Sequence, residues 1–441
     1  MISQKQVKTL LVPFVLWYLR TVAHKALAQT HATIIGIAGS VGKTSTREAL
    51  WAILKDVAPT HMVSGNSETG VPLGLVGLFP RDYSLLDWAR MLLTAPFRIG
   101  FLKQQKYVIV EMGIDDPYPP KNMEYLLTIV QPTIGIITEE SAAHTMQFEK
   151  LLNPTKVLSD TERLNFLIEA ITKEDAKMLK NCSIKIINGT NPFLIKKIPD
   201  AQTFQVTDYG VDLKKTTFSF TVDQKTITLL FRNHVFPKDL AYSFGPAILA
   251  AHKLNIPLDI IKTNLEKNFV PPRGRESIFD GIHNSIIIDS SYNASKQSVL
   301  SFLAMMKTLK KETKKSTIIV LADMLELGNE SQIEHESVAR AIGTIPDTLY
   351  LVGPLTKRFI LPIVEKITKH VEWFSTNTEL DLKLRDIPKN SLILFKGSQG
   401  NLWLEESIKL LLENKEDTSR LCRQNAFWKK VKIAAGRWVE V

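Results

Sequence analysis

A glycine-rich segment between a predicted strand and a predicted helix constrains this chain more than any other feature. Residues 33–38 (TIIGIA) are apolar and predict a short buried strand, and residues 44–56 (TSTREALWAILKD) predict an amphipathic helix. Between them, residues 39–43 (GSVGK) belong to a G-x-x-G-S-x-G-K-T-S pattern that starts at Gly36. Such a loop turns backbone N–H groups toward a polyphosphate at the positive end of the following helix. The segment therefore predicts a nucleotide site within an α/β domain.

The side chains of this loop have expected roles in binding that nucleotide. Lys43 would reach the outer phosphates, and the hydroxyl of Thr44 would bind Mg²⁺. The strict G-x-x-x-x-G-K-[ST] pattern is not met, because Ile37 stands at its first glycine. A purely structural loop is therefore the alternative. The candidate nucleotide-binding residues of the loop are Gly39, Ser40, Gly42, Lys43, Thr44 and Ser45.

The length of 441 residues predicts two or three hydrophobic cores. Strand, loop and helix units repeat to about residue 190, residues 201–236 alternate as antiparallel strands do, and a second α/β series follows Pro271-Pro272. The predicted fold class is α/β, with a P-loop parallel-sheet domain and a Rossmann-like domain after an N-terminal helix. The predicted parts are an amphipathic basic helix at 1–32, a central nucleotide-binding domain at 33–272 and a C-terminal α/β domain with a basic tail at 273–441.

Basic charge gathers near both ends of the chain. There are 55 Lys and Arg against 45 Asp and Glu, yet no acidic residue precedes Glu48, and six Lys or Arg lie in residues 420–437. Such ends favour either an anionic surface or simple solvation. The basic residues sit at the termini and no base-stacking module is evident, so no nucleic-acid partner is expected. Cys182 and Cys422 cannot form a disulfide framework or a four-cysteine zinc site, which suits a reducing cytoplasm.

Two apolar segments leave open whether the chain contacts a membrane. The run 10–19 (LLVPFVLWYL) is too short to cross a bilayer as a helix. It could lie on the inner face of the membrane with Trp17 and Tyr18 at the headgroups, which would make the protein peripheral, or dock onto the protein's own core. The segment 73–102 leaves the same choice, between a membrane-facing entrance and a cap in which the two segments cover each other.

Further segments, in order along the chain, resemble one family. They are Gly65-Asn66 with Gly70-Val71-Pro72-Leu73, residues 110–113 (VEMG), 138–144 (TEESAAH), Gly274-Arg275, 288–294 (IDSSYNA), 320–328 (VLADMLELG) with His335, and Lys396-Gly397-Ser398. Over residues 33–412 the chain resembles the Mur ligases, which are ATP-dependent amide-forming enzymes of cell-wall precursor synthesis. The D-S-S-Y-N-A and D-M-L-E-L-G elements resemble the branch that adds D-alanyl-D-alanine.

The resemblance implies a reaction and a set of site residues. ATP would phosphorylate a carboxylate of a peptidoglycan-precursor peptide, and the amine of D-Ala-D-Ala or a similar molecule would attack the acyl phosphate. Thr44 and Glu111 would share one Mg²⁺, and His144 would bind a second. The implied catalytic residues are Lys43, Glu111, His144 and Arg275, the residues at the nucleoside are Asp289, Tyr292 and Asn293, and the substrate residues are Asn66, Asp323 and Lys396.

The chain departs from the family pattern at three points. Asp175 stands where the family carries a carbamylated lysine, so Asp175 is a candidate metal ligand, with an ordinary charged helix face as the alternative. Glu139 replaces the usual Asn, and the family's N-terminal UDP-gripping domain is expected to be lacking. Two further hypotheses follow: a ligase for a lipid-linked or different carboxylate at the membrane, or a catalytically weakened nucleotide-binding scaffold.

Overall fold

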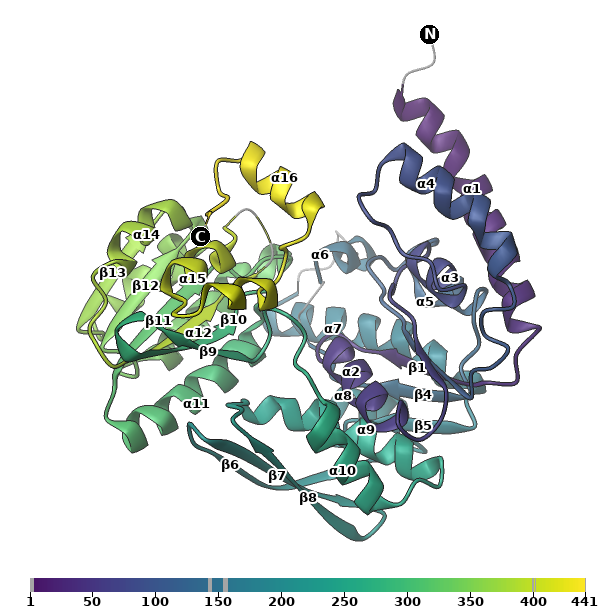
Figure 1. Ribbon diagram of the computed structural model, residues 1–441, viewed down its shortest axis with the longest axis horizontal. Coiled ribbons are helices and arrows are strands. Elements are labelled where there is room, and N and C mark those ends of the chain that lie inside the picture. Colours follow the sequence, from purple (N-terminus) through teal and green to yellow (C-terminus); the bar gives the residue numbers. More distant parts are fainter. Residues whose placement is uncertain (1–3, 142–144, 154–157, 399, 401, 441) are drawn as a thin grey trace. The chain divides into compact units, whose positions relative to one another are not determined.

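The computed structural model describes residues 4–141, 145–153, 158–398, 400 and 402–440, with side chains from residue 11 onward (Figure 1). The chain divides into two compact units. Unit 1 comprises Met1–Val206, Phe220–Ile227 and Tyr242–Val270, and unit 2 comprises Thr207–Ser219, Thr228–Ala241 and Pro271–Val441. The predicted limits at 32/33 and 272/273 stay predictions, because the units follow packing and interleave around residues 207–241.

Unit 1 is built on a five-stranded sheet with the order β2-β3-β1-β4-β5, in which all neighbours are parallel. Its strands are β1 (Thr33–Ala38), β2 (Thr60–Met62), β3 (Tyr107–Glu111), β4 (Ile134–Ile137) and β5 (Ile184–Ile187). β1 is the predicted strand 33–38, and its neighbours β3 and β4 are fully buried apolar runs, as expected of strands covered on both faces. The carboxyl ends of β3 and β4 therefore flank the glycine-rich loop after β1.

Helices cover the sheet of unit 1. They are α1 (Gln4–Leu27), α2 (Lys43–Leu54), α3 (Gly70–Leu75), α4 (Leu85–Thr94), α5 (Met123–Leu127), α6 (Thr145–Phe148), α7 (Asp160–Ala176), α8 (Pro192–Lys197), α9 (Ala241–Lys253) and α10 (Leu258–Asn268), with a 3-10 turn, η1 (Ala95–Arg98), after α4. α7 starts with a capping box between Ser159 and Glu162, which satisfies backbone donors at its first turn. Among the described residues, no helix combines the length and apolar character that crossing a membrane requires.

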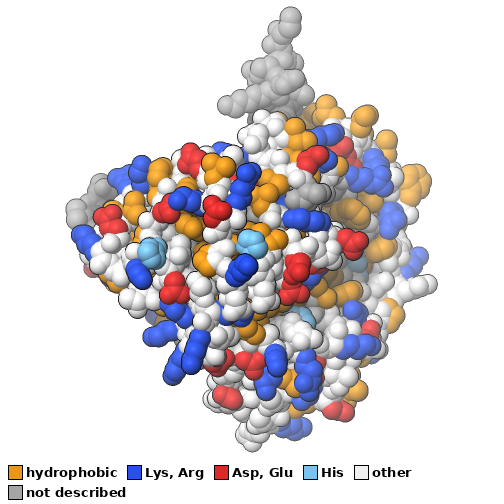
Figure 2. Space-filling view, turned by 60° about the vertical axis from the view of Figure 1, so that its left-hand side comes forward, with side chains coloured by type: hydrophobic (Ala, Val, Ile, Leu, Met, Phe, Trp, Pro, Cys, Tyr) orange, Lys and Arg blue, Asp and Glu red, His pale blue; other side chains and the backbone are white. Residues whose placement is uncertain are grey.

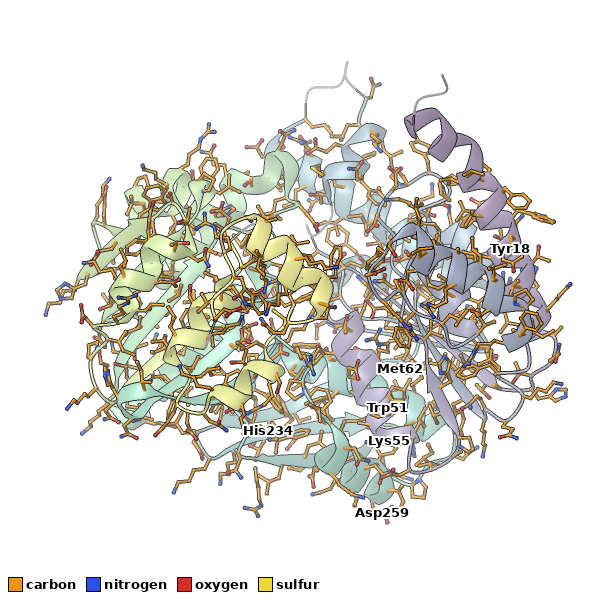
Figure 3. The ribbon with its side chains drawn as sticks, turned by 45° about the horizontal axis from the view of Figure 1, so that its top comes forward. Tyr18, Trp51, Lys55, Met62, His234 and Asp259 are labelled. Atoms are coloured by element: carbon orange, nitrogen blue, oxygen red, sulfur yellow. The ribbon has the colours of Figure 1, made fainter. Side chains whose placement is uncertain are left out.

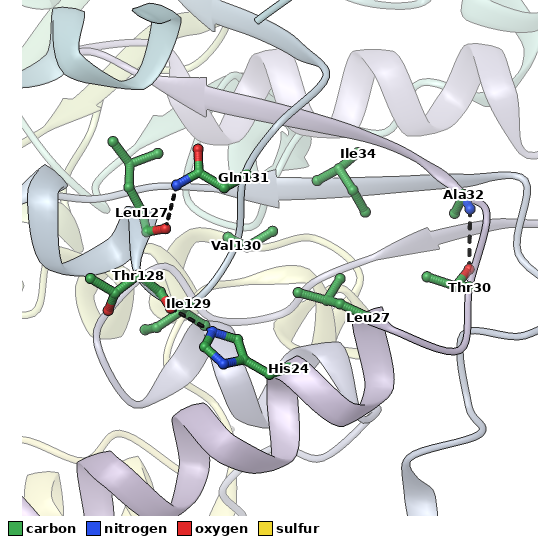
Figure 4. Close-up of a pocket in the computed structure, with 10 residues that line it drawn as sticks. All are labelled: His24, Leu27, Thr30, Ala32, Ile34, Leu127, Thr128, Ile129, Val130 and Gln131. Atoms are coloured by element: carbon green, nitrogen blue, oxygen red, sulfur yellow. Dashed lines mark hydrogen bonds between the residues drawn. The ribbon is translucent and has the colours of Figure 1, made fainter. Parts of the chain in front are cut away.

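The inner side of α1 docks onto the protein's own core, as one of the two predicted alternatives requires. Leu19 and Val22 pack with Leu73 and Met91 in one buried cluster. The Tyr18 hydroxyl donates to the carbonyl of Leu92 at 2.6 Å; Figure 3 labels Tyr18 on α1. Near its C-terminal end, α1 borders a pocket of ≈ 290 Å³. There, His24 Nε2 lies 2.6 Å from the carbonyl oxygen of Thr128 (Figure 4).

A separate three-stranded sheet has the order β6-β7-β8. Its strands are β6 (Gln205–Val211), β7 (Lys215–Val222) and β8 (Lys225–Arg232). Connections this short can join only antiparallel neighbours. β7 alternates buried and partly exposed side chains along its length, so the predicted alternating strands are confirmed.

Unit 2 contains a six-stranded sheet with the order β13-β12-β11-β14-β10-β9. Its strands are β9 (Ser277–Gly281), β10 (Ser285–Ser290), β11 (Ser316–Ala322), β12 (Thr348–Val352), β13 (His370–Phe374) and β14 (Ser391–Lys396), and its helices are α11 (Lys296–Thr313), α12 (Ser331–Ile342), α13 (Leu361–Val364), α14 (Asn377–Leu384), α15 (Leu404–Leu411) and α16 (Ala426–Ala434). Only β9 runs antiparallel to its described neighbour. The predicted parallel α/β architecture of both sheets is confirmed.

The basic tail of unit 2 is partly internal. Glu405 and Glu406 of α15 are fully buried, and Lys432 of α16 reaches both of them at 2.8 and 2.6 Å. Arg423 pairs with Glu405 at 2.8 Å, and Lys409 pairs with Glu406 at 2.7 Å. These five residues are called the C-terminal ion cluster below. Two of the six basic residues in 420–437 therefore neutralise buried carboxylates rather than solvating an exposed end.

Candidate active site

The backbone of the phosphate loop adopts conformations that favour glycine. Gly39 has φ 118° and Gly42 has φ 90°, and a Cβ atom at Gly39 would lie 2.5 Å from the Thr138 hydroxyl. Any other residue at position 39 would therefore be both strained and crowded. The loop is fastened to the end of β4, because the Ser40 N–H donates to the carbonyl of Glu139 at 2.7 Å. The loop is thus preformed between β1 and α2.

Lys43 starts α2 and folds back over the loop. Its ammonium group donates to the carbonyl of Gly39 and lies 3.4 Å from the carbonyl of Ser40. The structure therefore places a cation at the N-terminal end of a twelve-residue helix, where the helix dipole also favours an anion. Backbone donors, a helix end and a lysine at one place are the features that bind a polyphosphate.

Three residues contact Glu111 at the end of β3: Thr44 and Asn66, which were predicted, and Arg47, which was not. The Thr44 hydroxyl lies 3.3 and 3.2 Å from its two carboxylate oxygens, and Asn66 Nδ2 lies 3.3 Å from Oε1. Arg47 also pairs with Glu111 at 3.3 Å. Sequence reasoning missed Arg47, although it follows Thr44 by one helical turn and so faces the same side of α2.

The hydroxyl of Thr44 and the carboxylate of Glu111 are oxygen ligands of the kind that Mg²⁺ prefers. Mg²⁺ in nucleotide sites commonly uses one or two carboxylates, with phosphate oxygens and water completing its octahedron. Within the described ranges, no group of three or more His, Cys, Asp and Glu side chains lies close enough to hold a metal on its own. The residues present therefore fit a magnesium ion that is bound together with phosphates.

Asp175 and Glu140 form a buried pair of carboxyl groups against the phosphate loop. Asp175 Oδ2 accepts the N–H of Gly39 at 3.1 Å, and Glu140 Oε2 accepts the hydroxyl of Ser40 at 2.8 Å. Asp175 is only 1% exposed, which does not match the alternative of a solvated helix face. Sequence reasoning missed Glu140; its signal was a second carboxylate at the end of β4.

Burial changes the ionisation of both groups. Burial raises the pKa of Asp175 to about 6, although Lys43 lowers it. Burial and the charge of Asp175 raise the pKa of Glu140 well above its ordinary value. The remaining oxygens, Asp175 Oδ1 and Glu140 Oε1, have no hydrogen-bond partner among the described residues. One proton shared between the two carboxyl groups would satisfy both.

The structure describes the side chain of Glu139 but not that of His144. The carboxylate of Glu139 accepts from the side-chain amides of Asn188 and Asn191, the latter at 2.6 Å, so its side chain does not contact the loop. Its carbonyl oxygen binds the loop instead, and a backbone contact does not depend on the side chain. His144 lies outside the described residues, so its predicted metal role stays a prediction.

In unit 2, three predicted residues lie at the carboxyl end of β10: Asp289 within the strand, and Tyr292 and Asn293 in the turn after it. Burial raises the pKa of Asp289 to about 6; its Oδ1 accepts the N–H of Ser291 at 2.9 Å, and its Oδ2 has no hydrogen-bond partner among the residues that the structure describes. The ring of Tyr292 lies 5.0 Å from the guanidinium carbon of Arg275 and 5.5 Å from that of Arg423. Asn293 Oδ1 accepts the N–H of Ala294 at 2.9 Å.

Lys396, at the end of β14, supports the turn after β10. Its ammonium group donates to the carbonyl of Asn293 and lies 3.5 Å from that of Ser290. Burial lowers the pKa of Lys396 to about 7, although the nearby Glu276 raises it. Burial also raises the pKa of Glu276, which sequence reasoning did not single out. Lys396 is only 2% exposed, so the structure shows a supporting contact at this position.

Asp323 and His335 also make internal contacts. Asp323 Oδ1 accepts the N–H of Thr356 at 2.8 Å and so ties the end of β11 to the loop after β12. His335 Nε2 accepts the N–H of Met324 at 3.1 Å, and its Nδ1 lies 2.6 Å from the carbonyl of Ser331. This pattern requires a neutral imidazole with its proton on Nδ1, and burial correspondingly lowers the pKa of His335.

Comparison with known proteins agrees with this arrangement. A family described as "Mur ligase, glutamate ligase domain" matches residues 274–399. A UDP-N-acetylmuramoyl-tripeptide–D-alanyl-D-alanine ligase of Rickettsia prowazekii is 28% identical over 388 residues, which cover 84% of this chain and 76% of that protein. The protein of the same name from Escherichia coli is 22% identical over 401 residues, covering 88% and 78%.

The fold is also that of solved ligase structures. MurF ligase of Thermotoga maritima, solved in complex with ADP, superposes with a TM-score of 0.69 at 18% identity, covering 91% of this chain and 84% of that one. MurF of Acinetobacter baumannii gives a TM-score of 0.69 at 20% identity, covering 89% and 79%. At these identities the likeness establishes the fold.

Proposed function

We propose that this chain is a Mur ligase and, more specifically, an ATP- and Mg²⁺-dependent ligase of the MurF type. It would activate the peptide carboxylate of a UDP-linked muramyl tripeptide as an acyl phosphate and join it to the amine of D-alanyl-D-alanine. Curated relatives that cover most of the chain carry this activity in their names. A cytoplasmic location follows from the same proposal, since that is where such nucleotide-linked precursors would be used.

One observation carries the proposal: Lys43, the preformed loop and the Thr44–Glu111 pair occupy one end of the parallel sheet. Phosphoryl transfer requires positioning and charge neutralisation more than covalent help from the protein. The loop amides and Lys43 would bind the phosphates and stabilise the charge that develops on the transferred group. Thr44 and Glu111 would hold Mg²⁺, which neutralises phosphate charge when it is bound.

The other predicted site residues, Asp175, Asp289, Asp323 and Lys396, have proposed roles that follow from their contacts. One oxygen of Asp175 contacts the loop and the other has no hydrogen-bond partner within the described part of the chain, so Asp175 fits either a cation ligand or a brace for the loop. Asp289 has a buried oxygen that no described residue binds, which supports a contact to a ribose hydroxyl. Asp323 and Lys396 are occupied by backbone groups, so we propose that they shape the substrate site rather than bind the substrate directly.

The test is ATP hydrolysis to ADP and phosphate by the full chain, with UDP-linked muramyl tripeptide and D-Ala-D-Ala supplied together and singly. We expect turnover only when both are present, together with a pentapeptide product seen by mass spectrometry. Lys43→Ala should abolish product formation. Turnover that ignores either substrate would overturn the ligase proposal. A lipid-linked muramyl peptide, tested in parallel, would have to react faster to favour the alternative substrate.

One of the two observations behind the hypothesis of a catalytically weakened nucleotide-binding scaffold no longer supports it. It rested on Glu139 and Asp175, yet the contact of residue 139 with the loop is made by its carbonyl oxygen. Peripheral contact with a membrane remains a separate proposal, and it depends on surface side chains rather than on the active site.

A further inference from the structure

The outer sides of α1 and α4 carry large apolar side chains that the packing of unit 1 leaves uncovered. The three most exposed large apolar side chains among the described residues are Phe97, Leu85 and Leu86, at 90%, 88% and 84%. Leu93 of α4 is 72% exposed, and Trp17 of α1 is 53% exposed. A soluble surface rarely concentrates residues of this kind in one place without an interaction partner.

These side chains do not belong to the core formed by the two helices. In α4, Trp88, Met91 and Leu92 pack toward α1, whereas Leu86 and Leu93 project from the opposite side of the helix. Phe97 continues this outer stripe into η1. On α1, the rings of Phe14 and Trp17 lie 5.8 Å apart and both are more than half exposed. The two segments therefore cover each other on their inner sides, as the predicted cap requires, but leave apolar side chains exposed on their outer sides.

The charge of the same segments decides which partner fits. Residues 4–27 and 79–106 together contain nine Lys and Arg against two acidic residues. Asp87 pairs with Arg90 at 2.6 Å, and setting this pair aside leaves eight Lys and Arg against one acidic residue. Figure 2 shows hydrophobic side chains interspersed with Lys and Arg side chains, and with some Asp and Glu, on the face in view. A second copy of the chain would bring two positive surfaces together, whereas an anionic lipid surface would attract this one.

We infer that α1, α4 and η1 form a docking surface for an anionic membrane, on which the protein lies without crossing it. Leu86, Leu93 and Phe97 would enter the boundary between headgroups and acyl chains, and Trp17 would sit at headgroup level. Basic side chains beside them would bind lipid phosphates. This inference does not rest on the proposed ligase activity, because none of these residues belongs to the candidate active site.

The test is flotation of the full chain with vesicles of phosphatidylcholine alone or mixed with phosphatidylglycerol. We expect the chain to float with the anionic vesicles, less so with neutral ones, and less again in high salt. The double variant Leu93→Ser, Phe97→Ser should partition at least about tenfold more weakly, because two large apolar side chains no longer leave water. The matched control is Leu382→Ser, which removes a side chain of 64% exposure from α14.

Three results would overturn the inference. The first is that the wild-type chain does not float with anionic vesicles. The second is that the double variant and the Leu382→Ser control bind equally. The third is that light scattering shows a wild-type dimer that the double variant disperses, which would assign the surface to a second copy. ATP turnover in vesicle-free buffer, measured on the same preparations, confirms folding and reports separately on the ligase proposal.

Discussion

The phosphate-loop carboxylates, Asp175 and Glu140, and the C-terminal ion cluster are both buried, but only the cluster is fully compensated. In the cluster, each carboxylate contacts two cations, and these contacts lower the pKa of Glu405 despite its burial. Near the loop, burial outweighs Lys43, so the pKa values of Asp175 and Glu140 rise. Paired charge holds a structure together, whereas under-compensated charge beside a binding loop is typical of a functional site.

The largest effect should come from removing the cation of the loop. Lys43→Met should lower ATP turnover at least about 100-fold, since the ammonium group that we propose stabilises the transferred phosphoryl group would be lost. The cost in folding free energy should be no more than about 1 kcal/mol, because Asp175 can take up a proton instead. Steady-state kinetics and urea unfolding measure the two effects. If Lys43→Met instead destabilises the fold and leaves the turnover of the folded molecules unchanged, Lys43 has a structural role, and the contrast between the two clusters is wrong.

The next effect should come from the ion cluster. Lys432→Met leaves the fully buried Glu405 and Glu406 short of a cation, and should lower the free energy of unfolding by about 3–5 kcal/mol. Turnover per folded molecule should stay unchanged. Denaturant unfolding monitored by circular dichroism provides the first value and kinetics the second. A loss below about 1 kcal/mol would mean that the cluster is not the compensated structure described above.

These two clusters could be predicted from the sequence to different degrees. β1, the loop and α2 are local patterns, and the meeting of Thr44, Asn66 and Glu111 follows from the rule that parallel strands end at one edge of a sheet. The pairing of Asp175 with Glu140 could not be foreseen, because it depends on how α7 packs. The burial of Lys432 was hidden for the same reason, since one helix of mixed charge is typical of a solvated face.

A pH titration should separate the clusters by sign. Asp175 has a folded pKa of about 6 against an ordinary value of 3.8, so between these values the folded chain binds more protons than the unfolded chain. Its contribution therefore lowers the free energy of unfolding as pH rises from about 4 to about 6, by about 1–3 kcal/mol. Asp175→Asn should flatten this slope in unfolding experiments at stepped pH.

Glu405 should act in the opposite direction. Its lowered pKa means that it stabilises the fold above the ordinary value of 4.5, and that this contribution is lost as pH falls through the folded pKa. Stability in acid should therefore drop further in Asp175→Asn than in the wild-type chain, because the compensating gain is gone. Identical acid profiles for the two proteins would contradict the assignment of the raised pKa to Asp175.

The smallest effect is expected at an exposed pair on the same helix as Lys432. Lys429 lies 3.4 Å from Glu440, and both side chains are largely solvated. Lys429→Met should change the free energy of unfolding by no more than about 0.5 kcal/mol. Compared with Lys432→Met, this change separates burial from charge, since the substitution is the same and lies three positions away. A large loss of unfolding free energy in Lys429→Met would show that the basic tail stabilises the fold through its overall charge rather than through the buried ion pairs.

The C-terminal ion cluster also has a consequence for how the chain is made. Synthesis runs from the N-terminus, so Glu405 and Glu406 leave the ribosome before Arg423 and Lys432 do. Until Arg423 and then Lys432 follow, Lys409 is the one cation of the cluster present to balance two carboxylates that the finished fold buries. α15 therefore cannot settle against β10 and β14 at full stability while the chain is growing. Arg423 and Lys432 thus complete this packing, and a chain truncated before residue 423 would retain a loose, protease-sensitive unit 2.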